Sequence, residues 1–403
     1  MQTNLVSTHL SASDFAAADA ILRSCVHCGF CTATCPTYQL LGDELDSPRG
    51  RIYLIKGLLE GQEVTARTRL HLDRCLTCRS CETTCPSGVQ YGHLLDIGRQ
   101  HVERRVPRPL AARLLRRLLL AVLPFPRRYA LALGLARLTR PVLPRALRGK
   151  IPARQPASPR PAPRHARTVL LHEGCVQRVS TPATNAATAR VLDRLGISVV
   201  SLSQSDCCGA LHQHLSRADS ARGVMQANID AWWPLIEQGA EAIVITASGC
   251  SQMVKEYGYL LRDDPDYAHK ARRISELARD LSEVIAAQDL GTLASIGGGK
   301  RIAYHSSCTL QHGQKLGGTV ERILERCGYT LGSVADSHLC CGAAGTYMLT
   351  QPELSGQLRD NKLKALQQGQ PELIASANVG CQLHLAGAAS VPVKHWIELL
   401  DPA

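Results

Sequence analysis

Aromatic residues are scarce in this sequence: Phe, Trp and Tyr together make up 4% of its 403 residues. The hydrophobic cores must therefore be built mainly from Leu, Val, Ile and Ala, which suits helices and parallel strands better than an aromatic-rich β-sandwich. The chain is long enough for two or three domains that each bury a core. We expect an α/β fold.

A secretory signal and a membrane-spanning helix are both missing from the pattern. The N-terminal stretch MQTNLVSTHLSASDFAAAD has no charged region followed by an apolar core. The apolar run from Leu118 to Leu123 is flanked by Arg117 and Pro124, so no spanning helix is expected there. We expect a cytoplasmic protein whose ordinary thiols stay reduced.

A flavin or nicotinamide fingerprint is missing as well. The glycine run that starts at Gly297 precedes a strand-like segment instead of following one, and Arg301 stands where a phosphate-binding loop needs Ser or Thr. Without a hydride acceptor, this chain is not expected to oxidise an alcohol by itself. We therefore expect no catalytic residue on this chain and a substrate-oxidising site on a partner.

Cysteine, by contrast, is abundant, with 17 residues. In a reduced compartment this number indicates metal ligation or redox chemistry rather than a disulfide scaffold. Eight cysteines form two runs of the form Cys-x2-Cys-x2-Cys-x3-Cys-Pro, which begin at Cys25 and Cys75. Three thiolates of such a run converge on one cuboidal cluster, and the fourth reaches across to the other. The spacing predicts two [4Fe–4S] clusters, with Cys25, Cys28, Cys31 and Cys85 on the first and Cys75, Cys78, Cys81 and Cys35 on the second.

Structural zinc sites are the alternative for these two runs. Zinc sites usually combine two separated Cys-x2-Cys pairs, which is not the pattern seen here. The segment SPRGRIYLIKGLLEG between the runs predicts a helix. Its Arg49, Arg51 and Lys56 are candidates to moderate the negative charge of the clusters, but we expect them on a solvated helix face.

The C-terminal region is an internal duplication. In each copy a strand-like run ends near a cysteine, and a Cys-Cys-Gly triplet follows that cysteine by 32 positions. Each copy closes with an apolar strand and Gly-Cys. Because ligands gather at the carboxyl ends of parallel strands, we expect four thiols to converge in each copy. The two predicted sets are Cys175, Cys207, Cys208 and Cys250, and Cys308, Cys340, Cys341 and Cys381.

Several kinds of chemistry fit four converging thiols. They predict a further iron–sulfur cluster, another metal ion or a dithiol redox pair, and buried unreactive thiols are the alternative. We expect His172 and His305, three residues before the first cysteine of each set, to pack in the core. Cys327 aligns with Leu195 of the other copy and is expected to be structural.

The positive charge is confined to one part of the chain. Residues 101–168 contain 17 Lys and Arg and a single acid, which leaves 29 basic and 33 acidic residues elsewhere. We expect residues 1–100 to form a helical two-cluster domain, 101–168 a basic, amphipathic and proline-rich linker, and 169–290 and 291–403 two α/β domains. The Leu and Arg mixture of the linker fits an anionic membrane surface or an acidic partner subunit, and the scarcity of aromatic residues argues against nucleic acid.

The duplicated region resembles the cysteine-rich CCG domain family of heterodisulfide reductase, anaerobic glycerol-3-phosphate dehydrogenase and lactate-utilisation subunits. In heterodisulfide reductases the closing cysteine belongs to a Cys-x2-Cys pair, and the set holds non-cubane clusters. Here Ser-Gln-Met follows Cys250 and Gln-Leu-His follows Cys381, so the fifth cysteine is missing. That difference puts non-cubane clusters in doubt.

Over nearly its whole length, the chain resembles the iron–sulfur subunits of bacterial glycolate oxidase (glycolate dehydrogenase). The segments that carry this resemblance include CVHCGFCTATCPTYQLLGDELDSPRGRIYLIK, HLDRCLTCRSCETTCPSG and SHLCCGAAGTYMLT. The resemblance implies a complex with FAD-containing subunits that oxidise glycolate to glyoxylate. This chain would then pass electrons to a membrane acceptor such as quinone, at the inner face of the cytoplasmic membrane.

Three other functions remain open from the sequence. The first is the iron–sulfur subunit of a related lactate or glycerol-3-phosphate dehydrogenase. The second is a thiol or disulfide reductase that uses the Cys-Cys-Gly cysteines. The third is a zinc-stabilised basic binding protein.

Overall fold

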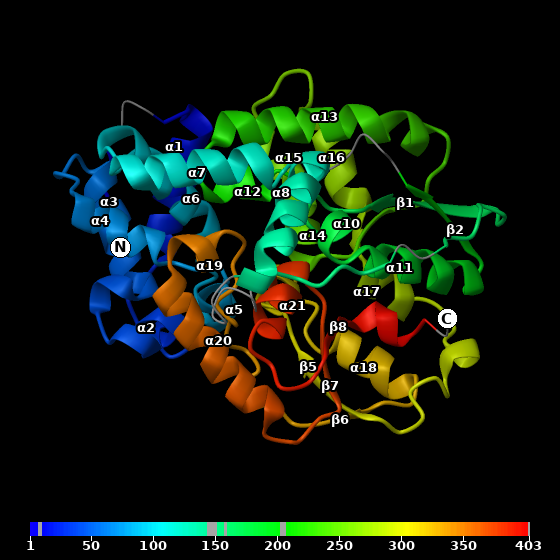
Figure 1. Ribbon diagram of the computed structural model, residues 1–403. Coiled ribbons are helices and arrows are strands. Elements are labelled where there is room, and N and C mark those ends of the chain that lie inside the picture. Colours follow the sequence, from blue (N-terminus) through cyan, green and yellow to red (C-terminus); the bar gives the residue numbers. More distant parts are fainter. Residues whose placement is uncertain (7–9, 143–150, 157–158, 202–206, 402–403) are drawn as a thin grey trace.

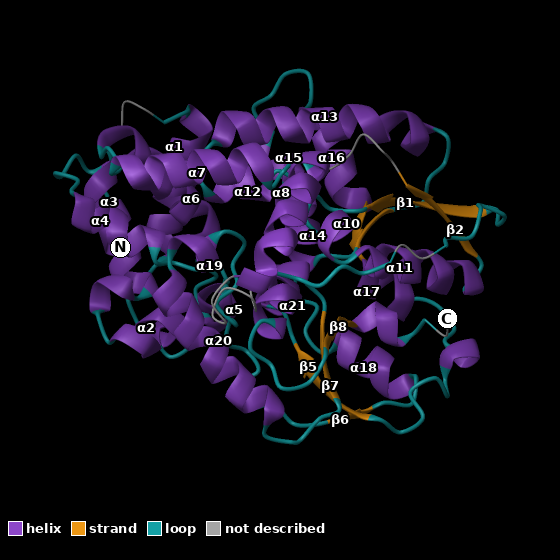
Figure 2. Ribbon diagram, in the orientation of Figure 1, coloured by secondary structure: helices purple, strands orange, loops and turns teal. Residues whose placement is uncertain are grey.

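The computed structural model describes residues 1–6, 10–142, 151–156, 159–201 and 207–401. The helices of the N-terminal part occupy one side of the molecule, and two small sheets lie on the other side (Figure 1, Figure 2). Parts of the expected basic linker, at 143–150 and 157–158, lie outside the described residues.

The N-terminal module is helical, as its sequence predicts. Ser11 and Ser47 accept hydrogen bonds from the first turns of α1 and α3, which fixes where both helices begin. Gly98 lets α3 and α6 approach closely, because a Cβ there would lie 2.7 Å from the side chain of Ile55. The helices of this module are α1 (Ala12–Ser24), α2 (Pro36–Leu41), α3 (Pro48–Leu59), α4 (Ala66–Asp73), α5 (Ser80–Thr84) and α6 (Tyr91–Arg105).

The basic region forms a bent pair of helices, α7 (Leu110–Val122) and α8 (Pro126–Thr139). Pro124 and Pro126 interrupt the helical hydrogen bonding between them. In the described residues no single helix has the length and hydropathy to cross a membrane. The stretches Leu110–Val122 and Pro126–Val142 meet those criteria only when taken together, and they are bent by 112°.

The rest of the described chain forms two four-stranded parallel sheets and the helices around them (Figure 2). Their orders are β2-β1-β3-β4 and β6-β5-β7-β8, so each strand of the first copy has a counterpart at the same place in the second. This arrangement confirms the α/β fold class. The strands are β1 (Arg167–His172), β2 (Ile197–Ser201), β3 (Ile243–Ile245), β4 (Ala278–Asp280), β5 (Arg301–His305), β6 (Thr330–Leu331), β7 (Leu373–Ser376) and β8 (Val393–His395).

Helices cover both faces of each sheet, as expected for parallel strands whose residues are buried on both sides. The helices of the two repeats are α10 (Gln177–Ser180), α11 (Pro182–Arg194), α12 (Ala210–His214), α13 (Ala218–Glu237), α14 (Ser248–Lys255), α15 (Tyr257–Leu260), α16 (Ala268–Leu277), α17 (Leu281–Ala286), α18 (Thr319–Arg326), α19 (Tyr347–Thr350), α20 (Pro352–Gln367) and α21 (Val379–Ala386).

The two repeats share one hydrophobic core. Val169 and Val244 of the first sheet belong to the same buried cluster as Ile302 and Trp396 of the second repeat. The backbone N–H of Ser248 also donates to the carbonyl of Ala377 in the other repeat, at 3.0 Å. The two sheets therefore pack as halves of a single body.

Candidate metal centres

The two ferredoxin-type runs line two neighbouring cavities. The first cavity is lined by Cys25, Cys28, Cys31 and Cys85, and Cys81 also reaches its wall. The second is lined by Cys35, Cys75, Cys78 and Cys81. In both cavities the fourth cysteine of one run thus joins the first three of the other. Two adjacent sets of four thiols fit the donor requirement of two [4Fe–4S] clusters.

The backbone of both runs makes the same left-handed turns. His27 and Thr77, each two residues after the first cysteine, have φ values of 56° and 54°. Gly29 and Arg79, each one residue after the second cysteine, have φ values of 88° and 57°. Such values are uncommon for residues with a side chain and mark a constrained functional loop. One result is that the backbone N–H of Thr77 points at the sulfur of Cys75, at 3.4 Å.

A buried arginine lies beside the second cavity. We expected Arg51 on a solvated helix face, and that prediction is wrong, because its side chain is 1% exposed. It donates to Thr37 and Asp46 at 3.1 and 3.2 Å, and one guanidinium nitrogen lies 3.9 Å from the sulfur of Cys35. Arg51 thus places a positive charge next to the second set of thiols.

The two cavities differ in their access to solvent. Cys28 is exposed, and Cys31 and Cys85 are partly exposed, whereas all four thiols of the second set are buried. Val26 and Phe30 are exposed beside Cys28. The first cavity is therefore open to an approaching molecule, and the second lies inside the protein.

The second run also contacts the second repeat. Leu76 and Cys78 pack in one buried cluster with Cys308, Cys340 and Tyr347. The hydroxyl of Tyr347 donates to the carbonyl of Arg74 at 3.1 Å. The buried cavity of the helical module is thereby joined directly to the cysteines of the second repeat.

The structure brings four thiols together in each repeat, as the sequence predicts. The sulfurs of Cys308 and Cys340 are 3.8 Å apart. The helices α14 and α21 carry the last cysteine of each set to the carboxyl end of its sheet.

Each repeat adds a histidine that we expected only to pack in the core. The side chains of His172, Cys208 and Cys250 lie within 4.8 Å of one another. His305, Cys341 and Cys381 form the equivalent group. Both histidines are buried, as expected, and each also supplies a ring nitrogen to its set of thiols.

In each set, hydrogen bonds between the thiols raise the pKa of the donating cysteine and lower the pKa of the accepting one. The hydrogen bond from Cys208 lowers the pKa of Cys250 to about 6, and burial opposes this effect. The pKa of Cys381 is likewise lowered, first by the hydrogen bond from Cys341 and then by His305. Hydrogen bonds from Cys175 and Cys308 likewise lower the pKa of Cys207 and Cys340. Each repeat therefore favours thiolates at its last cysteine and at the first cysteine of its triplet, the form that binds metal or acts as a nucleophile.

A central cleft of about 390 Å³ joins these sites. Cys175 and Cys250 of the first repeat, Cys340 of the second and Thr77 of the helical module all line it. Leu123 and Tyr129 of the α7 and α8 region form another part of its wall. The cleft thus has both repeats, the second ferredoxin-type run and the basic helices around it.

Charged side chains tie the helical module to the first repeat. Arg79, between Cys78 and Cys81, forms an ion pair with Glu256 of the first repeat. His93 contacts the same carboxylate at 3.1 Å. Burial alone would raise the pKa of Glu256, but the hydrogen bond from His93 and the charge of Arg79 lower it to about 2. The sequence offered no signal for this contact, since its partners lie more than 160 positions apart.

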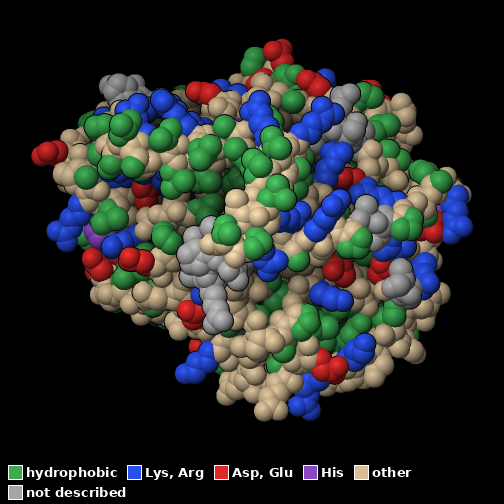
Figure 3. Space-filling model, in the orientation of Figure 1, with side chains coloured by type: hydrophobic (Ala, Val, Ile, Leu, Met, Phe, Trp, Pro, Cys, Tyr) green, Lys and Arg blue, Asp and Glu red, His purple; other side chains and the backbone are tan. Residues whose placement is uncertain are grey.

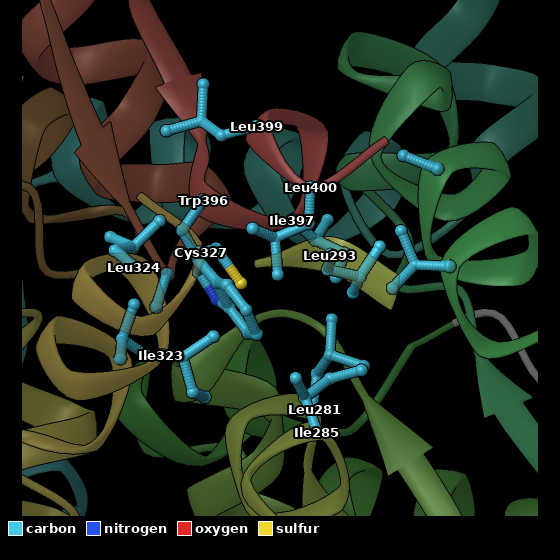
Figure 4. Packing of buried hydrophobic residues seen from close by; sticks show 14 of the residues in the cluster. Leu281, Ile285, Leu293, Ile323, Leu324, Cys327, Trp396, Ile397, Leu399 and Leu400 are labelled. Carbon is cyan, nitrogen blue, oxygen red and sulfur yellow. The ribbon is translucent and has the colours of Figure 1, made fainter. Parts of the chain in front are cut away.

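Cys327 lies apart from all of these sites. It is fully buried and packs with Ile323, Leu324 and Trp396 (Figure 4). It ends α18 as Leu195 ends α11, which matches the alignment of the two copies. Its surroundings are those of a small hydrophobic residue.

Comparisons with known proteins agree with this architecture. A family described as a 4Fe-4S dicluster domain matches residues 21–89, and one described as a cysteine-rich domain, CCG, matches 169–255 and 302–386. The glycolate oxidase iron–sulfur subunit of Escherichia coli is 58% identical over 404 residues, which cover 100% of this chain and 99% of that protein.

More distant relatives cover different shares of the chain. A probable glycolate oxidase iron–sulfur subunit of Bacillus subtilis is 31% identical over 396 residues, which cover 90% of this chain and 88% of that protein. Lactate utilization protein A of Bacillus velezensis is 27% identical over 246 residues, which cover 58% of this chain and 98% of that protein.

Proposed function

The chain belongs to the family of glycolate oxidase iron–sulfur subunits, and we propose that it is the electron-transfer subunit of such a complex. In this proposal Cys25, Cys28, Cys31 and Cys85 hold one [4Fe–4S] cluster, and Cys75, Cys78, Cys81 and Cys35 hold the other. When bound, these clusters accept and release single electrons. The resemblance of the full-length E. coli relative favours glycolate over the lactate and glycerol-3-phosphate alternatives, because the lactate-utilisation relative covers only 58% of this chain.

The observation that carries the proposal is the difference in exposure between the two cavities. Cys28 lies at the surface, whereas the second set of thiols is buried against Cys308 and Cys340 of the second repeat. Electrons would enter at the exposed site and leave from the buried one. The side chains around the buried site exclude water from that end of the path.

The donor in this proposal is an FAD-containing partner subunit, which oxidises glycolate to glyoxylate. Val26, Phe30 and Tyr53 support this role, because all three are exposed apolar residues near the first cavity. The ring of Tyr53 lies 6.1 Å from that of His27, in the loop of the first run. An apolar patch beside an exposed ligand gives a partner subunit a place to dock close to the cluster.

The acceptor in this proposal is a lipophilic molecule such as quinone, and the protein lies at the inner face of the cytoplasmic membrane. The central cleft supports this role, since its wall is mostly apolar and includes Leu76 and Thr77 of the second run. Its volume of about 390 Å³ falls within the range of small-molecule sites.

The cysteine-rich repeats hold two further candidate sites, for an additional iron–sulfur cluster, another metal ion or a dithiol redox pair. The candidate ligands are Cys175, Cys207, Cys208 and Cys250, and Cys308, Cys340, Cys341 and Cys381. The histidine beside each set supports metal binding, because imidazole and thiolate together suit Zn²⁺ and iron. A thiol or disulfide reductase is the second candidate function, favoured by the 3.8 Å separation of Cys308 and Cys340.

Metal analysis with a matched pair of variants tests the proposal. Anaerobically purified chain should contain about eight irons and eight acid-labile sulfides, with interacting [4Fe–4S] signals in EPR. Cys28→Ser should lose about half of both, and Cys327→Ala should lose none. In the complex, Cys28→Ser should abolish electron transfer to the natural acceptor while the partner still reduces an artificial dye.

Four outcomes would change or extend this assignment. Zinc without sulfide would overturn the electron-transfer function. Unchanged transfer in Cys28→Ser would remove the first cluster from the path. Iron well above eight per chain would place a further cluster in the repeats, and disulfide turnover by the isolated chain would favour the reductase.

A further inference from the structure

Exposed apolar side chains are concentrated in one part of the molecule. Sixteen large hydrophobic residues are exposed among those that the structure describes, and nine of them lie between Leu110 and Val142. Soluble proteins rarely expose contiguous apolar patches without a binding role. We call this region the α7–α8 surface. Its exposed apolar members are Leu110, Leu114, Leu115, Leu118, Phe125, Leu131, Leu135, Leu138 and Val142.

Both helices turn an apolar stripe away from the protein. On α7 the stripe consists of Leu110, Leu114 and Leu118, at helical spacings of four, while Leu119 is buried on the opposite side. An ordinary surface helix buries its apolar stripe and exposes polar residues. On α8 the exposed stripe is made of Leu131, Leu135 and Leu138, at spacings of four and three.

The charge around these stripes has one sign. Arg113 and Arg117 flank the stripe of α7, and Arg127 and Arg140 are exposed at the two ends of α8. Within the described part of the chain, none of these four arginines forms an ion pair.

The nearby acids are already neutralised. Asp73 pairs with Arg108 and Arg116, and Glu103 pairs with Arg108. Among the residues that the structure describes, no acidic side chain therefore balances the exposed arginines.

The bend makes the surface flat enough for a broad contact. Two straight helices that meet at an angle lie in one plane, and these meet at 112°. Hydrophobic side chains with arginines among them gather over both helices on the same face of the molecule (Figure 1, Figure 3). A helix pair with this bend suits a position along a bilayer rather than across it.

We propose that the α7–α8 surface docks on the headgroup layer of an anionic lipid bilayer. The leucine stripes would enter the boundary of the acyl chains, and the arginines would reach the phosphates above them. Arg113, Arg117, Arg127 and Arg140 lie beside the leucine stripes or at the helix ends, so this surface offers positive charge to anionic headgroups. This charge complementarity favours lipid over a partner subunit. The inference deepens the proposed function, on whose membrane acceptor it rests.

Docking in this orientation would bring the central cleft to the lipid. Leu123 and Tyr129, at the end of α7 and in the first turn of α8, line that cleft together with Thr77 of the second run. A lipophilic acceptor would therefore reach the electron-donating end of the protein without crossing water.

Vesicle sedimentation with the full-length chain tests the surface. Binding to phosphatidylcholine vesicles with 30% phosphatidylglycerol should exceed binding to pure phosphatidylcholine and should weaken with added salt. Arg113→Gln/Arg117→Gln should weaken it by about fivefold for each arginine. Leu114→Gln/Leu135→Gln should weaken it by at least about tenfold, since two leucines that enter the acyl-chain boundary on docking are lost.

Matched variants elsewhere on the surface serve as controls. Arg222→Gln/Arg273→Gln removes two arginines whose side chains are 53% and 51% exposed. Leu41→Gln/Leu70→Gln removes two exposed leucines. Both controls should bind vesicles like the unaltered chain. Equal loss in controls and test variants, or no preference for anionic vesicles, would overturn the proposal.

A second assay separates lipid from protein docking. Test variants that bind vesicles normally but fail to co-purify with the flavin-containing subunits would overturn the lipid surface and make it a subunit interface. Dye reduction by the complex in solution should remain unchanged in the test variants. Vesicle binding requires no substrate, so its failure is distinguishable from failure of the proposed function.

Discussion

The buried arginine of α3 shows how one side chain can adjust a redox centre. Arg51 lies between Asp46 and Cys35, inside a wall that excludes water. A positive charge beside an anionic cluster favours the more negative, reduced form. Net charge and hydrogen bonds to sulfur are among the factors that set cluster potentials.

Replacing Arg51 should lower one reduction potential. Loss of about 1–2 kcal/mol of electrostatic stabilisation in Arg51→Gln corresponds to about 40–80 mV for a one-electron couple. An EPR-monitored redox titration should show this fall for the second cluster only, and Arg51→Lys should show a smaller one. Arg67→Gln, at an exposed position, serves as the control. Equal potentials in Arg51→Gln and the control would remove this role from Arg51.

Cys327 allows a test of a cysteine without redox chemistry. Its sulfur lies beside Trp396 in the shared core (Figure 4). Cys327→Ala should lower the free energy of unfolding by about 1–2 kcal/mol through lost packing. Denaturant unfolding measures this loss. Iron content, measured by metal analysis, and electron transfer to the acceptor in the complex should not change. A folded variant that loses iron would contradict the structural role.

The spacing of the cysteines predicted more of the site than the charge of the neighbouring residues did. The two cysteine runs could be recognised from spacing alone, because each run is a short local pattern. Their crosswise assignment to two clusters stays a prediction. Arg51 was placed wrongly, although it lies four and seven positions from the buried Ile55 and Leu58 on one helical stripe. A charged residue on an apolar stripe is therefore the signal that could have identified its burial.

At the scale of elements, strand order is what brings the histidines to the thiols. His172 ends β1, which pairs with β3 and lies opposite Ile245, five residues before Cys250. Periodicity predicted buried parallel strands but not which strands are neighbours. The contacts of His172 and His305 with cysteines could therefore not be foreseen from the sequence.

One short strand also links the two repeats through a histidine. The Nε2 of His395, at the end of β8, donates to the carbonyl of Thr246 at 3.0 Å. Its Nδ1 accepts from the backbone N–H of Ile397 at 3.2 Å. Both ring nitrogens are thus used by the neutral form, and burial lowers the pKa of His395 to about 4.

This histidine predicts a loss of stability in acid. Because the folded pKa is below the unfolded value of 6.5, the stabilisation is complete above pH 6.5 and is lost as the pH falls towards 4. The full difference is up to about 3 kcal/mol. Denaturant unfolding at pH 7.5, 6.0 and 5.0 should show this dependence, and His395→Gln should reduce it. The exposed His269→Gln should leave it unchanged; a profile equally steep in His395→Gln would contradict the argument.

At the scale of the whole molecule, the charged contact between Arg79 and Glu256 joins two modules. Both side chains are mostly buried, and His93 shares the carboxylate. This contact holds the loop between Cys78 and Cys81 against the first repeat, while Tyr347 holds the same module against the second. The helical module is thereby fixed to both repeats.

Removing the buried charge should loosen this joint. Glu256→Gln leaves Arg79 with only the longer contact to Glu82, at 3.9 Å, and should cost up to about 3–5 kcal/mol of unfolding free energy. Glu241→Gln is the matched control, because its pair with Arg167 is 40% and 47% exposed and should contribute less than about 1 kcal/mol. Thermal unfolding followed by iron–sulfur absorbance should show earlier loss in Glu256→Gln. Similar unfolding midpoints for the two variants would show that the ion pair between Arg79 and Glu256 contributes little to stability.

The shared core of the repeats has a consequence during synthesis. Trp396 packs in the same core as Val169 and Val244 but is translated about 150 residues after Val244. At roughly 5–20 residues per second, the ribosome needs on the order of ten seconds to deliver it. During that time the side chains of the first sheet that pack against Trp396 lack this partner on the nascent chain. A truncated first repeat should therefore need a chaperone, and a stop codon before Trp396 should send the whole chain to aggregation or proteolysis.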